Sequence, residues 1–238
     1  MLRALALSLA LFAAHPAAAQ SFNQQEQAEI RAIVREYLVR NPDVLKDALA
    51  ALETRVSSDR WREVTADRRD FSIGPADAPI VIVEYFDYRC PYCHAAYEWV
   101  RDLVRTRRDV RLVLKELPVL GPASMEAARA SLAAMPQGRY WEFHGALIGY
   151  RGDLTSEAID TLARRSGIDV ARMRRAMEDE AITRQLEEVR AQAIEYQCDG
   201  TPGFVINGET TPGFHRATLE ARLREAARQA RTRQQAQR

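Results

Sequence analysis

The stretch IVIVEYFDYRCPYC, residues 80–93, decides the fold of this chain. Its first seven residues are almost all apolar, which predicts a strand buried on both faces of a parallel or mixed sheet. Cys90 and Cys93 follow, at the point where this strand would give way to a helix. Two cysteines with this spacing at such a junction are typical of a redox-active dithiol. The rest of the chain is organised around this pair.

The two cysteines are expected to differ in chemistry. Free N–H groups and the positive end of the helix dipole favour a thiolate at Cys90, so its pKa should lie below the ~8.5 of a free cysteine. Cys93, one turn later, can attack a mixed disulfide formed at Cys90. The pair therefore has the parts needed for a complete cycle of thiol–disulfide exchange.

Composition and the first residues indicate an exported, soluble protein. The 238 residues are 47% hydrophobic and carry a net charge of +1, which allows a sizeable core and does not favour a nucleic-acid partner. Residues 1–19 combine one basic residue, an apolar run of about 11 residues and small residues near the end, as in a secretory signal peptide. The run is shorter than the ~20 residues of a membrane span. We therefore expect a periplasmic protein, in a compartment where disulfides form.

Residues 20–60 are expected to form an N-terminal helical segment. Apolar residues follow a helical spacing on both sides of Asn41-Pro42, which stops one helix and starts the next. The second helix carries an apolar stripe, formed by Leu45, Leu49, Leu52 and Val56. This stripe packs either on the chain's own domain or on copies of itself, as in an oligomerisation stalk. Residues 57–69 are mostly polar and would be a connecting helix or a linker, and the linker is placed at 61–73.

The remaining pattern alternates strands and helices. A second strand is expected at 110–115, a largely helical region at 123–196, and a short strand at 203–206. Asn207-Gly208 predicts a tight hairpin turn before a returning strand, and a last helix should run from 217 to about 230.

One acidic residue stands out within the first strand. Glu84 lies in a segment otherwise suited to burial, where its carboxyl must either hold a proton or find a cation. Lys115, on the second strand, is placed to supply that cation, and Glu84 behind Cys93 could relay the proton that Cys93 loses. Alternatively, Glu84 points outward at a strand edge.

These features resemble the DsbA-like branch of the thioredoxin superfamily over residues 71–231. The matching motifs are GPADAP at 74–79, residues 84–93, LPVLGP at 117–122 and GTPGFVING at 200–208. The resemblance implies an α/β thioredoxin-like fold with an inserted helical domain and an N-terminal helical extension. Its first part would be 74–122, the insertion 123–196 and the second part 197–231, followed by a tail, 232–238.

The resemblance also implies roles for individual residues. Cys90 would be the nucleophile and Cys93 the resolving thiol, with Pro202 a cis-proline facing them. The backbone beside that proline pairs with the substrate chain like an added strand, so Thr201 would contact substrate. Glu84 and Lys115 match the buried acid and lysine of the wider superfamily.

Three features depart from or extend this pattern. The dipeptide between the cysteines is Pro-Tyr where strongly oxidising members have Pro-His, so the potential should be less extreme. Cys198 lies outside the pattern and is either a buried, inert thiol or part of a regulatory disulfide. The N-terminal segment resembles the stalk of the suppressor-of-copper-sensitivity thiol proteins, oligomeric isomerases, which implies a homo-oligomer through residues 21–60.

Isomerisation of wrong disulfides in exported proteins is favoured over oxidation, because of the stalk and the Pro-Tyr dipeptide. An isomerase needs a membrane thiol reductase to reset the dithiol, whereas an oxidase needs a membrane oxidase. No cofactor is expected in either case. Two alternatives remain: c-type haem attachment through Cys90–His94, with His94 as axial ligand, and copper or zinc held by Cys90, Cys93 and His94.

Overall fold

The computed structural model describes residues 22–236 of the chain, so the signal peptide expected at 1–19 lies outside the described residues. The described residues up to Thr54 form one compact unit and those from Arg55 onward form a second. Each unit is described here by itself. Among the described residues, no helix has the length and apolar character needed to span a bilayer.

The N-terminal unit contains α1, Gln24–Arg40, and the first part of α2, Pro42–Ala66. A capping box begins α1, in which Asn23 accepts from the Glu26 amide at 3.0 Å while the Glu26 carboxylate accepts from the Asn23 amide at 2.8 Å. The two helices are separated at Asn41, as the sequence predicts. Large apolar side chains of both helices are exposed: Ile33 is 66% exposed and Leu49 is 60% exposed.

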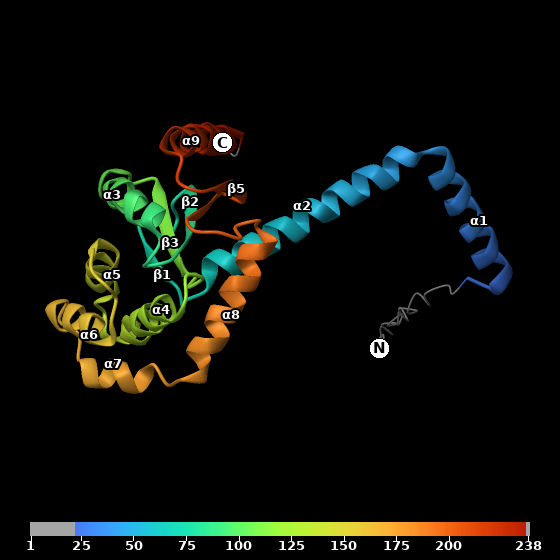
Figure 1. Cartoon of the computed structure of the whole chain (residues 1–238). Coiled ribbons are helices and arrows are strands. Elements are labelled where there is room, and N and C mark those ends of the chain that lie inside the picture. The colour runs from blue at the N-terminus through green and yellow to red at the C-terminus, as the bar shows by residue number, and fades with distance from the viewer. Residues whose placement is uncertain (1–21, 237–238) are drawn as a thin grey trace, which may run out of the picture. The chain divides into compact units, whose positions relative to one another are not determined.

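The second unit is built on a mixed sheet of five strands with the order β1-β3-β2-β4-β5 (Figure 1). The strands are β1 Phe71–Ile73, β2 Ile80–Phe86, β3 Val110–Glu116, β4 Gly203–Ile206 and β5 Glu209–Pro212. β2 and β3 pair in parallel, and the other neighbours are antiparallel. The predicted central strand and the mixed sheet are therefore confirmed, as is the Asn207-Gly208 hairpin, where both residues have positive φ.

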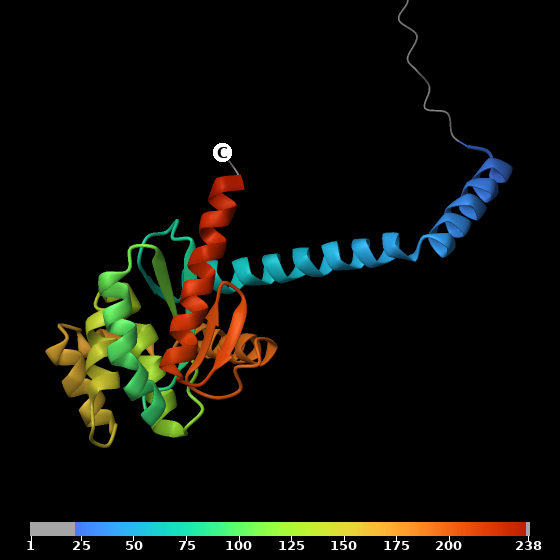
Figure 2. The same ribbon diagram turned by 90° about the horizontal axis from the view of Figure 1, so that it is seen from above.

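Helices cover both faces of this sheet (Figure 2). α3, Pro91–Thr106, and α9, Arg216–Ala236, pack on the face that carries Ile82 and Phe86. α8, Glu180–Glu195, packs on the face that carries Val83 and Tyr85, together with Val64 near the end of α2. Burial on both faces explains why β2 is a nearly continuous apolar run.

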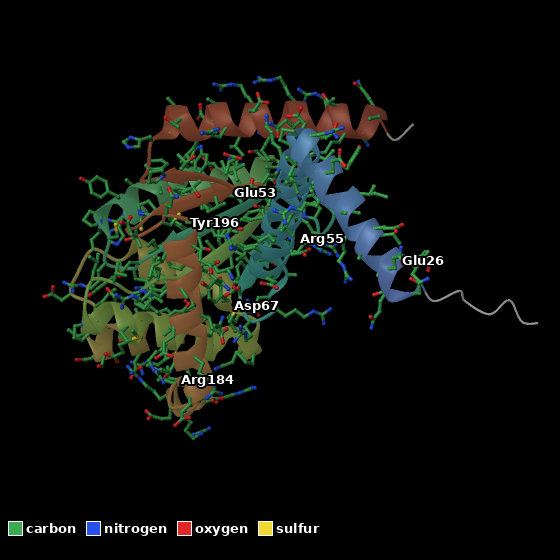
Figure 3. All side chains as sticks on the ribbon, turned by 90° about the vertical axis from the view of Figure 1, so that its right-hand side faces the viewer. Glu26, Glu53, Arg55, Asp67, Arg184 and Tyr196 are labelled. Carbon is green, nitrogen blue, oxygen red and sulfur yellow. The ribbon has the colours of Figure 1, made fainter. Side chains whose placement is uncertain are left out.

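A helical region is inserted between β3 and β4. It consists of α4 Pro122–Ala134, the short 3₁₀ helix η1 Met135–Gln137, α5 Tyr140–Gly149, α6 Ser156–Arg165 and α7 Val170–Ala176, and α8 leads back to the sheet. In Figure 3, Arg184 and Tyr196 mark the two ends of α8, and Asp67 marks the end of α2. This arrangement confirms the thioredoxin-like fold with an inserted helical domain.

Two boundaries differ from those expected. The linker placed at 61–73 contains the last turns of α2, in line with the alternative of a connecting helix, and also the unexpected strand β1. Its few apolar residues are used in packing: Val64 is 2% exposed, and Phe71 stacks on Tyr140 at 4.6 Å between ring centroids. The tail predicted at 232–238 is helical as far as Ala236, since α9 continues through it.

Candidate active site

The dithiol lies at the start of α3. Cys90 is the N-cap residue and Pro91 occupies the first helical position, where a proline loses no hydrogen bond. The Cys90 amide donates to the carbonyl of Asp87 at 3.1 Å, and the Cys90 carbonyl accepts from the His94 amide at 3.1 Å. Cys90 and Cys93 are buried, 4% and 1% exposed, and both are free thiols.

The surroundings shift the pKa values of the two thiols in opposite directions. The pKa of Cys90 is lowered to about 5, first by a hydrogen bond from the Cys93 thiol, and further by the Thr201 side chain and by the amides of Cys93 and Tyr92. The pKa of Cys93 is raised, because this thiol is buried and donates to Cys90. Sequence reasoning gave the helix amides the main role, whereas the largest contribution comes from the neighbouring thiol.

The loop before β4 contacts the nucleophile. The Thr201 carbonyl accepts from the Cys90 thiol at 3.1 Å, and the Thr201–Pro202 peptide bond is cis. The Pro202 carbonyl in turn accepts from the Gly213 amide at 2.9 Å, which ties this loop to the end of β5. The backbone at 201–202 therefore lies within reach of a polypeptide bound at Cys90.

Glu84 is buried in the centre of the sheet, 4% exposed, so the alternative of an outward-pointing side chain is wrong. Burial raises the pKa of this carboxyl to about 8, with a further contribution from the charge at Cys90. When Glu84 is ionised, its charge also raises the pKa of Cys93. Glu84 thus lies within electrostatic reach of both sulfurs and holds a proton near neutral pH.

The expected pairing of Glu84 with Lys115 is wrong. Lys115 lies opposite Tyr85 in the β2–β3 register, and Glu84 lies opposite Leu114. Since side chains alternate between faces along a strand, Lys115 points to the face that carries α8. There it forms a buried ion pair with Asp70, which also accepts from Gln185 at 3.0 Å. Lys115 is held in the core, away from the dithiol.

Asp87 is a site residue that the sequence did not single out. It lies three residues before Cys90, is 1% exposed, and accepts four hydrogen bonds. The donors belong to Arg89 and to the segment that leads from β3 into α4. An aspartate directly after a buried strand and before a helix start was the only available signal.

A second buried polar cluster lies beside Asp87. The Glu116 carboxyl accepts from the hydroxyls of Tyr88 at 2.9 Å and Tyr140 at 2.7 Å. The Tyr88 hydroxyl also contacts Ser131 at 2.8 Å and His144 Nδ1 at 3.2 Å. Burial raises the pKa of Glu116 to about 8 and lowers that of His144 to about 3. This cluster connects the turn before Cys90 to the inserted helices.

The remaining candidates, His94 and Cys198, have other contacts. His94 Nε2 is 2.6 Å from the Tyr88 carbonyl, so the nitrogen that a haem iron would need is already engaged. Cys198 is buried on the α8 face, where burial raises its pKa to about 12. A Cβ at Gly203 would approach its Sγ to 2.8 Å, which shows how tightly this thiol is packed. Within residues 22–236, no group of three His, Cys, Asp or Glu side chains is arranged to hold a metal ion.

A family model described as the DsbA-like thioredoxin domain matches residues 81–224. The chain belongs to this family. The two free thiols at the start of α3 fit thiol–disulfide exchange. A second model, the N-terminal domain of the copper resistance protein ScsC, matches residues 26–56, most of α1 and the first half of α2. Both expected resemblances are confirmed.

Solved structures agree with this assignment. A thioredoxin-like oxidoreductase from Silicibacter pomeroyi is 37% identical, with a TM-score of 0.65 over 70% of this chain and 95% of that one. A linker-deletion variant of ScsC from Proteus mirabilis is 25% identical, with a TM-score of 0.65 over 89% of this chain and all of that one. The ScsC structure extends the similarity into the N-terminal helices.

Curated relatives share only part of their length with this chain. The protein named Na(+)/H(+) antiporter NhaA 1 from Salinispora arenicola is 34% identical over 149 residues, which is 62% of this chain and 23% of that protein. The chain therefore spans about a quarter of such relatives. The shared part coincides in size with the DsbA-like domain, so the antiporter name describes those longer proteins.

Proposed function

We propose that this protein is an exported, periplasmic thiol–disulfide oxidoreductase that acts on polypeptide disulfides through Cys90 and Cys93. The observation that carries the proposal is the opposite displacement of the two thiol pKa values within one helical turn. A low pKa gives Cys90 a thiolate at neutral pH, and a high pKa keeps Cys93 protonated until it is needed. Such an asymmetric pair can capture a substrate and later release it.

The cycle follows from these two states. The Cys90 thiolate attacks one sulfur of a substrate disulfide, forms a mixed disulfide and displaces the other substrate sulfur as a thiolate. Once Cys90 is in the mixed disulfide, the charge that helps to raise the pKa of Glu84 is gone. The ionised form of Glu84 then accepts the proton of Cys93, and the Cys93 thiolate attacks Cys90. This step forms the Cys90–Cys93 disulfide and releases the second substrate thiol. The substrate gains two electrons and the protein loses them; oxidation of a substrate is the same sequence in reverse.

Isomerisation is the favoured use of this chemistry. An isomerase must hold a substrate in a mixed disulfide while another substrate thiol attacks, and it must remain reduced. The Pro-Tyr dipeptide lacks the imidazole that strongly oxidising relatives carry between their cysteines, and the N-terminal unit resembles ScsC. The expected partners are misdisulfided exported proteins and a membrane thiol reductase that resets the dithiol.

Activity on two forms of one substrate protein, one with scrambled disulfides and one fully reduced, distinguishes isomerisation from oxidation. Reduced enzyme should restore activity to a substrate with scrambled disulfides, and Cys90→Ser should abolish this recovery. Oxidised enzyme should act more slowly on the fully reduced substrate. Faster action on the reduced substrate would instead indicate an oxidase. If Cys90→Ser kept both activities, the proposal itself would be overturned.

The N-terminal unit is proposed to join copies of the chain. Its apolar side chains, among them Ile33, Val34, Leu49 and Leu52, are 50–66% exposed and recur at helical spacing on α1 and α2. Burial of such a stripe against a second copy would remove a large apolar area from water. An assembly would then present several dithiols to one misfolded substrate.

A further inference from the structure

We propose that Asp87 is a positioning residue, which ties the exposed aliphatic segment Val119–Leu120 to the turn that carries Cys90 and thereby gives the site a preference for apolar polypeptide segments. The inference rests on the proposed function, because it specifies which substrates that site prefers. It arises from the hydrogen bonds of one buried carboxylate that takes no direct part in sulfur chemistry.

The Asp87 carboxylate is fully used. One oxygen accepts from the Arg89 amide at 2.7 Å and from the Ser124 hydroxyl at 2.7 Å. The other accepts from the amides of Val119 at 2.8 Å and Leu120 at 3.0 Å. A carboxylate offers about four acceptor sites, so all of them are occupied here. Asparagine, with one acceptor oxygen, cannot reproduce this set.

These bonds join two segments that lie far apart in the sequence. The main chain of Asp87 also accepts from the Cys90 amide at 3.1 Å, so the same residue contacts the nucleophile's own backbone. A second connection runs in parallel, since the Arg89 guanidinium donates to the Leu120 carbonyl at 2.8 Å. The position of Val119–Leu120 relative to Cys90 is therefore fixed through one turn of chain.

The segment held in this way presents apolar surface. Val119 is 41% exposed and Leu120 is 42% exposed, while Tyr92, within the dithiol motif, is 69% exposed. Exposed aliphatic and aromatic side chains beside a nucleophile offer contact area to a chain captured there. The substrate class is thus an extended polypeptide with aliphatic or aromatic residues next to its cysteine.

Two disulfide-linked peptides of equal length and charge test this. One carries Leu and Val next to its cysteine, and the other carries Ser and Gly. The wild-type protein should reduce the first with a kcat/KM about tenfold higher, which corresponds to a modest apolar contact. In Asp87→Asn the ratio between the two peptides should fall towards one. A change in the ratio reports specificity, which a general loss of folded protein would not alter.

Controls separate the outcomes. Asp102→Asn removes an exposed carboxylate of α3 and should keep the wild-type ratio. Ser124→Ala removes one of the four bonds and Leu120→Ser removes one apolar side chain; both should lower the ratio, and they carry the test if Asp87→Asn does not fold. A wild-type ratio in a folded Asp87→Asn, or equal rates for both peptides in the wild type, overturns this inference. Failure of the wild type to react with either peptide would instead contradict the proposed function.

Discussion

At the scale of single residues, the chemistry depends on how each ionisable group is buried. Cys90 has a pKa of about 5, first because the Cys93 thiol donates to its sulfur, and further because of hydrogen bonds with the Thr201 side chain and with the amides of Cys93 and Tyr92. Glu84 and Glu116, both on the face of the sheet that carries α3, have pKa values of about 8 because burial disfavours their charge. The pKa values of these two carboxyls thus lie above that of the Cys90 thiol, although free carboxyls titrate near ~4 and a free cysteine near ~8.5.

Glu84→Gln tests proton transfer to and from Cys93. Without a carboxylate behind it, the Cys93 thiol loses its base, so the mixed disulfide at Cys90 should persist at least about tenfold longer. Acid quenching followed by mass spectrometry measures its lifetime. Glu98→Gln, on the exposed side of α3, serves as the matched control. An unchanged lifetime in Glu84→Gln would remove this residue from the mechanism.

The raised carboxyl pKa values also predict a pH dependence of stability. A carboxyl whose pKa is higher when folded than when unfolded stabilises the fold fully below ~4.5, and this contribution is lost as the pH rises towards about 8. Urea unfolding of the oxidised protein, in which Cys90 does not titrate, should therefore show falling stability from pH 5 to 8. Glu116→Gln keeps an acceptor for both tyrosines and should reduce this slope. A slope equal to that of the wild type would contradict a protonated Glu116.

At the scale of elements, the β2–β3 pair separates catalytic groups from structural ones. Glu84 points towards α3 and the dithiol, whereas Lys115 points towards α8 and Asp70. One residue of register decides which face a side chain occupies. The pair Lys115–Asp70 joins β3 to the segment between α2 and β1, so its role lies in stability.

The substitution Lys115→Met tests whether this pair stabilises the fold. It leaves Asp70 as a buried carboxylate without its cation, which typically costs about 3–5 kcal/mol of folding free energy. Denaturant unfolding measures the loss, and the pKa of Cys90 should keep its wild-type value because the pair lies on the other face. Asp109→Asn breaks the partly exposed pair with Arg107 and should cost at most about 1 kcal/mol. A shift of the Cys90 pKa in Lys115→Met would contradict this separation and show that Lys115 acts on the dithiol.

The elements themselves were largely predictable, and the contacts between them were not. The apolar run at 80–86, the Asn207-Gly208 turn and the helical periodicities each carry a local signal, which the structure confirms. β1 has only three residues and is stabilised by pairing with β3, so no local sequence pattern predicts it. The Asp87 contacts with Val119 and Leu120 likewise depend on tertiary folding, because the donors are backbone amides that any sequence would provide.

At the scale of the whole molecule, the two units differ in how they use their apolar residues. The catalytic unit buries its apolar residues around one sheet, whereas the N-terminal unit keeps its apolar stripe exposed and matches the ScsC N-terminal domain. The proposed consequence is an assembly of several catalytic units, held together by their N-terminal helices.

Substitutions in the stripe test this assembly. Leu49→Asp together with Leu52→Asp places charges where a second copy would pack, so the solution mass should fall to that of one chain. Light scattering after size exclusion measures this mass, and Lys46→Asp, an exposed polar position on the same helix, should leave it unchanged. A monomeric wild-type protein, or an unchanged mass in the double variant, would contradict assembly through this stripe.

The central claim is the thiolate at Cys90, and its titration is the most direct test. In the reduced protein, thiolate absorbance should rise with a midpoint near pH 5. This transition should be absent in Cys90→Ser and should move to higher pH in Cys93→Ala, which removes the largest stabilising hydrogen bond. A midpoint near the ~8.5 of a free cysteine would contradict the account.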